Sequence, residues 1–119
     1  MFRTSQDRNA QFLMNRRTAP SEIELHCEWD DLVLVRSGLG VLRHSRKLRG
    51  LRHYGWSEWR ATELVSAAEV NLTAGDVVRV PAGEAHTIRS LGDAPLVYLV
   101  VKVRTFEELP CGSLPNKGR

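Results

Sequence analysis

Residues 75–86 read GDVVRVPAGEAH and carry the local signals that decide the fold of this chain. Gly75 allows a tight turn, because glycine adopts backbone angles that other residues avoid. The run Val77–Val80 is rich in β-branched residues and is typical of a strand, and Pro81 ends it because proline has no N–H for the next ladder bond. Gly83 then allows a second turn. The stretch therefore predicts a short strand between two turns.

Strand signals of the same kind continue on both sides of this stretch. Alternating or β-branched runs, separated by turn residues, occur at 21–28, 32–35, 40–43, 47–52, 69–72, 85–90 and 96–103. About eight short strands at close spacing predict an all-β antiparallel sandwich or barrel. Residues 57–68 are ambiguous, since Trp59, Leu64 and Val65 fit a helical stripe capped by Ser57. We favour a loop and an edge strand there, because every surrounding segment is β.

The length of 119 residues suits one domain, and 42% hydrophobic with 26% charged residues is ordinary globular composition. We expect an N-terminal arm at 1–19, the β-barrel domain at 20–105 and a flexible C-terminal tail at 106–119. The longest apolar run, 94–103, is interrupted by Pro95 and Lys102. It is shorter than the roughly 18 residues that a membrane span needs, so we expect no membrane partner.

The net charge is +3, and much of the basic excess lies in one stretch, residues 41–54. Such a stretch could contact nucleic acid. Its basic residues alternate with leucines and match no nucleic-acid motif, so solvated strand faces explain it more simply. We therefore do not expect nucleic acid as a partner.

The first residues contain no apolar stretch of a secretory signal, so we expect a cytoplasmic protein or one whose signal was removed before residue 1. Cys27 and Cys111 are the only cysteines, and they match no disulfide scaffold. We expect both to be free thiols.

Four residues have side chains suited to metal binding. Glu24 and His26 are two apart and leave the same face of a strand, Asp31 begins a hydrophobic strand, and His86 follows the turn at Gly83. Inward polar residues from different strands of a small barrel must meet in its single interior. The set would suit Fe²⁺, Mn²⁺, Ni²⁺, Co²⁺ or Zn²⁺. A Glu-x-His pair on a strand is also common on a solvent face, and spacing alone leaves both interpretations open.

Two segments carry a resemblance to the cupin superfamily. Residues 75–86 resemble its second motif, G-x5-P-x-G-x2-H-x3-N, with Ser90 in the place of the final Asn. Residues 24–38 resemble more loosely its first motif, H-x-H-x(3–4)-E-x6-G, with Glu24 replacing the first His and Asp31 replacing the Glu. The chain looks most like the small single-domain cupins whose first motif begins Glu-x-His.

The resemblance implies a double-stranded β-helix, or jelly-roll, barrel with a divalent metal ion held by Glu24, His26, Asp31 and His86. It implies a metal-dependent enzyme of oxygenase, isomerase or lyase type acting on a small molecule, with Fe²⁺ favoured and Mn²⁺, Ni²⁺ or Zn²⁺ as alternatives. A non-catalytic ligand-binding or sensor cupin is the other interpretation. By the same resemblance we expect a homodimer.

Asp31 has one methylene fewer than glutamate, so three outcomes are open at the site. Asp31 could coordinate the ion as a fourth ligand, or it could orient His26 or a water while Glu24, His26 and His86 hold the ion. In the third outcome no metal binds, and Glu24 and His86 act as an acid–base pair.

The aromatic residues near the middle of the chain have no assigned role. Trp29, Tyr54, Trp56 and Trp59 could line a ligand pocket, or they could form core or a subunit interface. Glu58 and Arg60 flank Trp59 and could form a lid over the mouth of the barrel.

Overall fold

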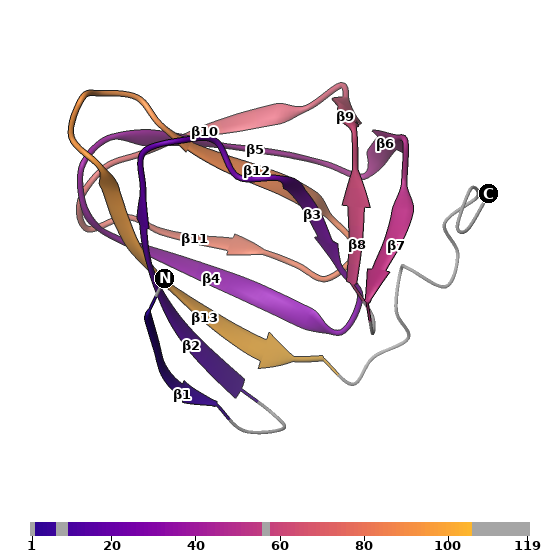
Figure 1. Ribbon diagram of the computed structural model, residues 1–119, viewed down its shortest axis with the longest axis horizontal. Helices are drawn as coiled ribbons and strands as arrows, with labels where there is room; N and C mark the ends of the chain where they lie inside the picture. The colour runs from indigo at the N-terminus through magenta and orange to yellow at the C-terminus, as the bar shows by residue number, and fades with distance from the viewer. Residues whose placement is uncertain (1, 7–9, 56–57, 106–119) are drawn as a thin grey trace.

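The computed structural model describes residues 2–6, 10–55 and 58–105. Within these ranges the chain forms strands and no helix (Figure 1). The strands are β1 (Phe2–Gln6), β2 (Ala10–Arg17), β3 (Ile23–His26), β4 (Trp29–Ser37), β5 (Gly40–Ser45), β6 (Lys47–Arg49), β7 (Arg52–Gly55), β8 (Glu58–Ala61), β9 (Glu63–Val65), β10 (Ala68–Leu72), β11 (Val77–Val80), β12 (Ala85–Ser90) and β13 (Leu96–Arg104).

Two large antiparallel sheets make up the barrel. One sheet has the strand order β1-β2-β13-β4-β11, and the other has the order β10-β5-β12-β3-β8-β7. The short strands β6 and β9 pair separately. The prediction of an all-β antiparallel fold is confirmed.

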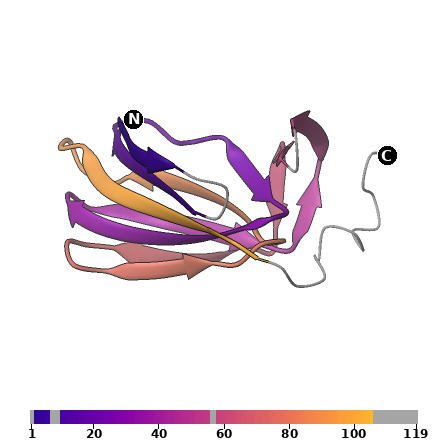
Figure 2. The same ribbon diagram turned by 90° about the horizontal axis from the view of Figure 1, so that it is seen from below.

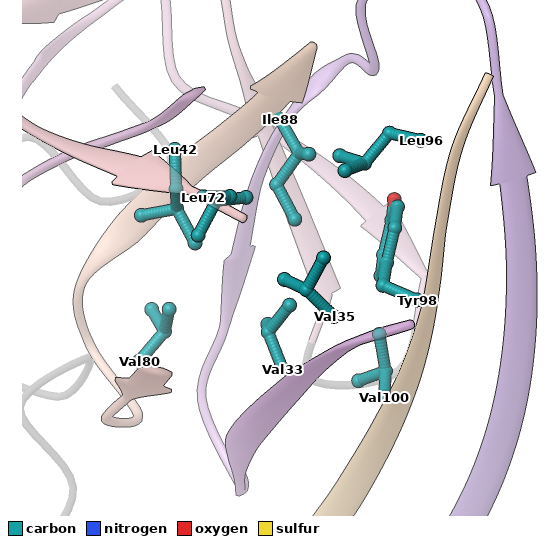
Figure 3. Close-up of a cluster of buried hydrophobic side chains, with 9 residues drawn as sticks. All are labelled: Val33, Val35, Leu42, Leu72, Val80, Ile88, Leu96, Tyr98 and Val100. Carbon is teal, nitrogen blue, oxygen red and sulfur yellow. The ribbon is translucent and has the colours of Figure 1, made fainter. Parts of the chain in front are cut away.

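The main core lies between the two sheets. Strand β4 alternates buried and partly buried residues along most of its length, and β13 does the same, as expected for strands with one face toward a core. Side chains from one sheet point toward those of the other (Figure 3). This cluster consists of Val33, Val35, Leu42, Leu72, Val80, Ile88, Leu96, Tyr98 and Val100.

A second apolar cluster packs behind β3. Leu25 is fully buried there, and Cys27, Leu51, Ala61, Leu64 and Ala85 belong to the same cluster. Leu25 and Cys27 lie on the opposite face of the chain from Glu24 and His26, as the alternating sequence predicted. This packing fixes which face of β3 is turned to the interior.

The N-terminal segment contributes two strands, β1 and β2, to the sheet that contains β13. Strand β2 pairs with β13 along its whole length, from Arg17 opposite Leu96 to Ala10 opposite Val103. The indigo and yellow-orange strands lie side by side in both views (Figures 1 and 2). The inward positions of β2 include Asn15 and Arg17, which line a cavity.

Within the ambiguous segment, the described residues form strands β8 and β9 and no helix. The expected edge strand is wrong for β8, because β8 lies between β3 and β7 in the sheet. Strand β8 pairs with β3 and β9 pairs with β6, so both bury their backbone polar groups in ladders. Ser57 and Trp56 lie outside the described residues, as does the tail expected at 106–119. Helices that could span a membrane are absent from the described part of the chain.

The expectation of free thiols is wrong for Cys27, which is disulfide-bonded and 5% exposed. No cysteine spacing in the sequence predicted this bond. Cys111 lies outside the described residues. Disulfides persist mainly in oxidising compartments, so this bond does not support the expected cytoplasmic location. That location stays a prediction.

Candidate metal centre

Three of the four predicted ligands come together on the inner face of β3 and β12. Glu24 of β3 lies directly opposite His86 of β12 in the antiparallel register, and His26 is the next inward residue of β3. Ligand atoms of Glu24, His26 and His86 all lie within 4.8 Å of one another. We call these three residues the donor triad. Two imidazoles and one carboxylate at this spacing could hold a divalent transition-metal ion.

The orientation of His26 is set by Glu58, which lies opposite it on the neighbouring strand β8. Both carboxylate oxygens of Glu58 are within hydrogen-bond distance of His26 Nδ1, at 2.7 and 2.8 Å. Nδ1 therefore donates to Glu58, and Nε2 points into the site. A carboxylate behind a histidine in this way fixes the ring and raises its basicity as a ligand.

His26 Nε2 is buried and has no hydrogen-bond partner among the described residues. It faces two carboxylates, with Glu24 Oε1 and Asp31 Oδ2 each 3.3 Å away. A buried polar atom without a partner is costly, and it marks a place where a further group binds. The atom and its surroundings therefore fit a cation.

Asp31 reaches the site from β4, and its two oxygens have different partners. Oδ1 accepts a hydrogen bond from Lys102 Nζ at 2.8 Å, while Oδ2 lies 3.3 Å from His26 Nε2 and 3.6 Å from His86 Nε2. Asp31 and Lys102 are both buried. The shorter side chain thus still touches both imidazoles, although one of its oxygens is committed to the ammonium group.

The charges at the site favour a bound cation. Burial alone would raise the pKa of Glu24, but the close contact with His26 and the charges of His26, His86 and Arg60 lower it to about 2. Burial would also raise the pKa of Asp31, yet His26 and Lys102 hold it well below its usual value. Both carboxylates are therefore ionised at neutral pH.

The two histidines respond in opposite ways. Burial would lower the pKa of His26, but its contacts with Asp31, Glu24 and Glu58 raise it to about 10. Burial lowers the pKa of His86, and the positive charges of His26 and Lys102 add to this. In the absence of metal, protonated His26 balances the negative charge of the neighbouring carboxylates. A bound metal cation would replace that proton.

Arg60 of β8 supports the carboxylates from behind and does not form the lid considered above. Arg60 is 9% exposed, and its guanidinium lies 3.8 Å from Glu24 Oε2 and 3.6 Å from Glu58 Oε1. It also stacks on the ring of Tyr54 at 4.0 Å. Arg60 therefore binds both a member of the donor triad and the partner of His26.

The donor triad opens into a cavity of about 420 Å³. Its aliphatic lining residues are Leu13, Val33, Ile88 and Val100, and its polar groups lie at the end formed by the donor triad and at a second end near the terminus of β2. The lining residues are Leu13, Asn15, Arg17, Ser21, Glu24, His26, Asp31, Val33, His86, Ile88, Tyr98, Val100 and Lys102. Trp29, Tyr54 and Trp59 are not among them, and Trp56 lies outside the described residues.

The sequence analysis did not predict that Glu58 and Lys102 contact the predicted ligands His26 and Asp31. Lys102 had a visible signal, since it interrupts the apolar strand LVYLVVKVR, and a lysine inside such a strand needs a buried partner. Glu58 had no such signal, because only the pairing of β8 with β3 places it behind His26.

Comparison with known proteins agrees with this architecture. Residues 61–102 match the family model for the cupin domain. A search of curated proteins found no match. The matched segment includes the stretch 75–86.

Solved structures of similar shape include enzymes that use the same barrel. An oxalate decarboxylase from Lactobacillus farciminis, solved as a formate complex, is 21% identical with a TM-score of 0.59; the match covers 80% of this chain and 24% of that one. A hydroquinone 1,2-dioxygenase, solved with Cd²⁺ and 4-hydroxybenzonitrile, is 19% identical with a TM-score of 0.64, covering 86% of this chain and 62% of that one. This chain thus spans about a quarter of the decarboxylase.

A further match is a cupin superfamily protein from Desulfitobacterium hafniense, which is 16% identical with a TM-score of 0.57. That match covers 86% of this chain and 73% of the other. At these identities the similarity shows a common double-stranded β-helix fold.

Proposed function

We propose that this chain, which has the cupin fold and matches the cupin-domain model over residues 61–102, is a metal-dependent enzyme of oxygenase, isomerase or lyase type that acts on a small molecule in its barrel. The observation that carries the proposal is His26 Nε2, buried, without a hydrogen-bond partner among the described residues, and turned by Glu58 toward Glu24 and His86. The decarboxylase and the dioxygenase of the same fold support it, since both are enzymes acting on small molecules.

The donor triad favours Fe²⁺ as the bound ion, with Mn²⁺, Ni²⁺ or Zn²⁺ as alternatives. Two histidines and one carboxylate are typical of non-haem Fe²⁺ sites that leave coordination positions open for substrate. Such an ion, when bound, acts as a Lewis acid or as the site of oxygen chemistry.

The surrounding residues would orient the ligands and keep water out. Glu58 holds His26 in the tautomer that presents Nε2. Lys102 holds Asp31 beside both imidazoles, so that Asp31 adds negative charge next to the ion from outside the triad. Val33, Ile88 and Val100 give the adjoining cavity apolar walls, which strengthens electrostatic interactions inside it.

Metal content tests the proposal directly. Protein purified anaerobically without chelator is expected to carry close to one divalent ion per chain, measured by elemental analysis, because the triad offers a single set of donors. Chelator-stripped protein is expected to regain the ion from Fe²⁺, Mn²⁺, Ni²⁺ or Zn²⁺ solutions and to melt at a higher temperature when loaded. A chain that holds no ion as purified and takes none up would refute the proposal.

Removing the partner of His26 should weaken the metal site without destroying it. Glu58→Ala is expected to lower metal affinity about tenfold to hundredfold, the range typical when a histidine loses its supporting carboxylate. Chelator competition measures the affinity. Glu63→Ala is the matched control, because Glu63 is exposed on β9 and pairs with Arg49. Equal affinities in the two variants would exclude a supporting role for Glu58.

A further inference from the structure

The cavity has a second polar end, formed around Arg17 at the end of β2. Arg17 Nε donates a hydrogen bond to the Tyr98 hydroxyl at 3.0 Å, and both residues line the cavity with the donor triad. Tyr98 is 3% exposed, so its hydroxyl holds the guanidinium from a buried position. Asn15 and Ser21, which are close to Arg17 in the sequence, also line the cavity.

Arg17 and Lys102 are the two basic residues that line the cavity, and they differ in whether a carboxylate pairs with them. Lys102 is neutralised by Asp31, whereas no carboxylate of the described residues lies within ion-pair distance of Arg17. The bond to Tyr98 uses one of the five N–H donors of the guanidinium, and the other four have no described protein partner. Burial raises the pKa of Tyr98, so its hydroxyl keeps a proton that it can donate.

The space between the two polar ends is apolar and short. Tyr98, Val100 and Lys102 are alternate residues of β13 that face the cavity, and strand geometry separates the first from the last by about 13 Å along the strand. Leu13, Val33 and Ile88 complete the walls. A ligand that fits must be anionic at one end, apolar in the middle and able to approach the triad at the other end.

We infer that the cavity binds small organic carboxylates, with Arg17 and the Tyr98 hydroxyl holding the carboxylate and the rest of the molecule directed toward the donor triad. Arginine presents paired donors that match a carboxylate bidentately. That such a carboxylate is the substrate rests on the proposed function, whereas its binding at Arg17 does not. The pair therefore selects which molecules enter and how they are turned.

The test uses butyrate as the probe and the Arg17 side chain as the reporter. The full chain is titrated with butyrate in chelator-stripped and in Zn²⁺-loaded form, while the Nε–Hε resonance of Arg17 is followed by NMR. Saturable shifts of this resonance are expected in both forms, and none with equal concentrations of butyramide or chloride. Metal content is measured on the same samples.

Three variants make the outcome decisive. Arg17→Met is expected to lower butyrate affinity about tenfold to hundredfold, as for the loss of charged hydrogen bonds, with unchanged metal uptake. Tyr98→Phe removes the acceptor for Arg17 Nε and is expected to lower the butyrate affinity severalfold. Arg16→Met is the matched control, because it removes the same charge from an exposed neighbour on the same strand.

For the variants, binding is measured by calorimetry, and melting curves show whether each variant is folded. Equal butyrate affinity in wild type and Arg17→Met, an equal loss in Arg16→Met, or equal shifts with chloride or butyramide would overturn the inference. Chloride shifts would identify an adventitious ion only. Butyrate binding at Arg17 in a chain that takes up no metal would support this subsite while refuting the proposed function.

Discussion

His86→Ala is expected to reduce metal affinity by more than about 100-fold, beyond the range usual for the loss of a supporting group. His86 is a buried member of the donor triad and lies directly opposite Glu24. Its loss leaves one imidazole and one carboxylate, too few protein donors for a stable site. Chelator competition gives the affinity, and the rise in melting temperature on adding metal should disappear.

The control for this prediction is another histidine of the same domain. His53 is exposed on β7 and stacks on Trp59 with ring centroids 4.8 Å apart, so His53→Ala is expected to retain full metal uptake. A His86→Ala protein that is folded and binds metal as tightly as wild type would place the ion elsewhere. His86→Gln, which keeps most of the side-chain volume, separates loss of the ligand from loss of packing.

Gly38→Ala is expected to destabilise the fold by about 3–5 kcal/mol, near the upper end of single substitutions. Gly38 follows β4 with φ of +89°, and a Cβ placed there would lie 2.3 Å from the carbonyl oxygen of Pro95 and 3.0 Å from Leu96 Cα. Both obstacles are backbone atoms, so neither can rotate away. Chemical denaturation followed by circular dichroism measures the loss.

Gly75→Ala separates the cost of the positive φ from the cost of the steric clash that an added Cβ causes at Gly38. Gly75 has a similar φ of +94°, yet nothing lies within 4 Å of an added Cβ. Only backbone strain remains, which costs about 1–2 kcal/mol. Equal losses in the two variants would show that the contact with residue 95 does not contribute.

Local patterns were enough to predict the fold class and most strand positions. Val77–Val80 and Ala85–Ser90 form strands β11 and β12 at the positions expected, because proline, glycine and β-branched residues act on the backbone nearest to them. The alternation around Glu24 and His26 also predicted their shared face. Their role as metal ligands, like the homodimer and the domain boundaries, stays a prediction.

Some features of the chain follow from residue types alone: strands with turns between them, the inward face of β3, and the turns at Gly75 and Gly83, both of which have positive φ. Others exist only because the chain is folded. Glu58 stands behind His26, Lys102 neutralises Asp31, and Arg17 meets Tyr98, each across a long sequence separation. The physical reason is the sequence distance over which each interaction acts. Backbone preferences depend on a few neighbouring residues. Charge pairing and cavity shape depend on which strands the sheet register places side by side.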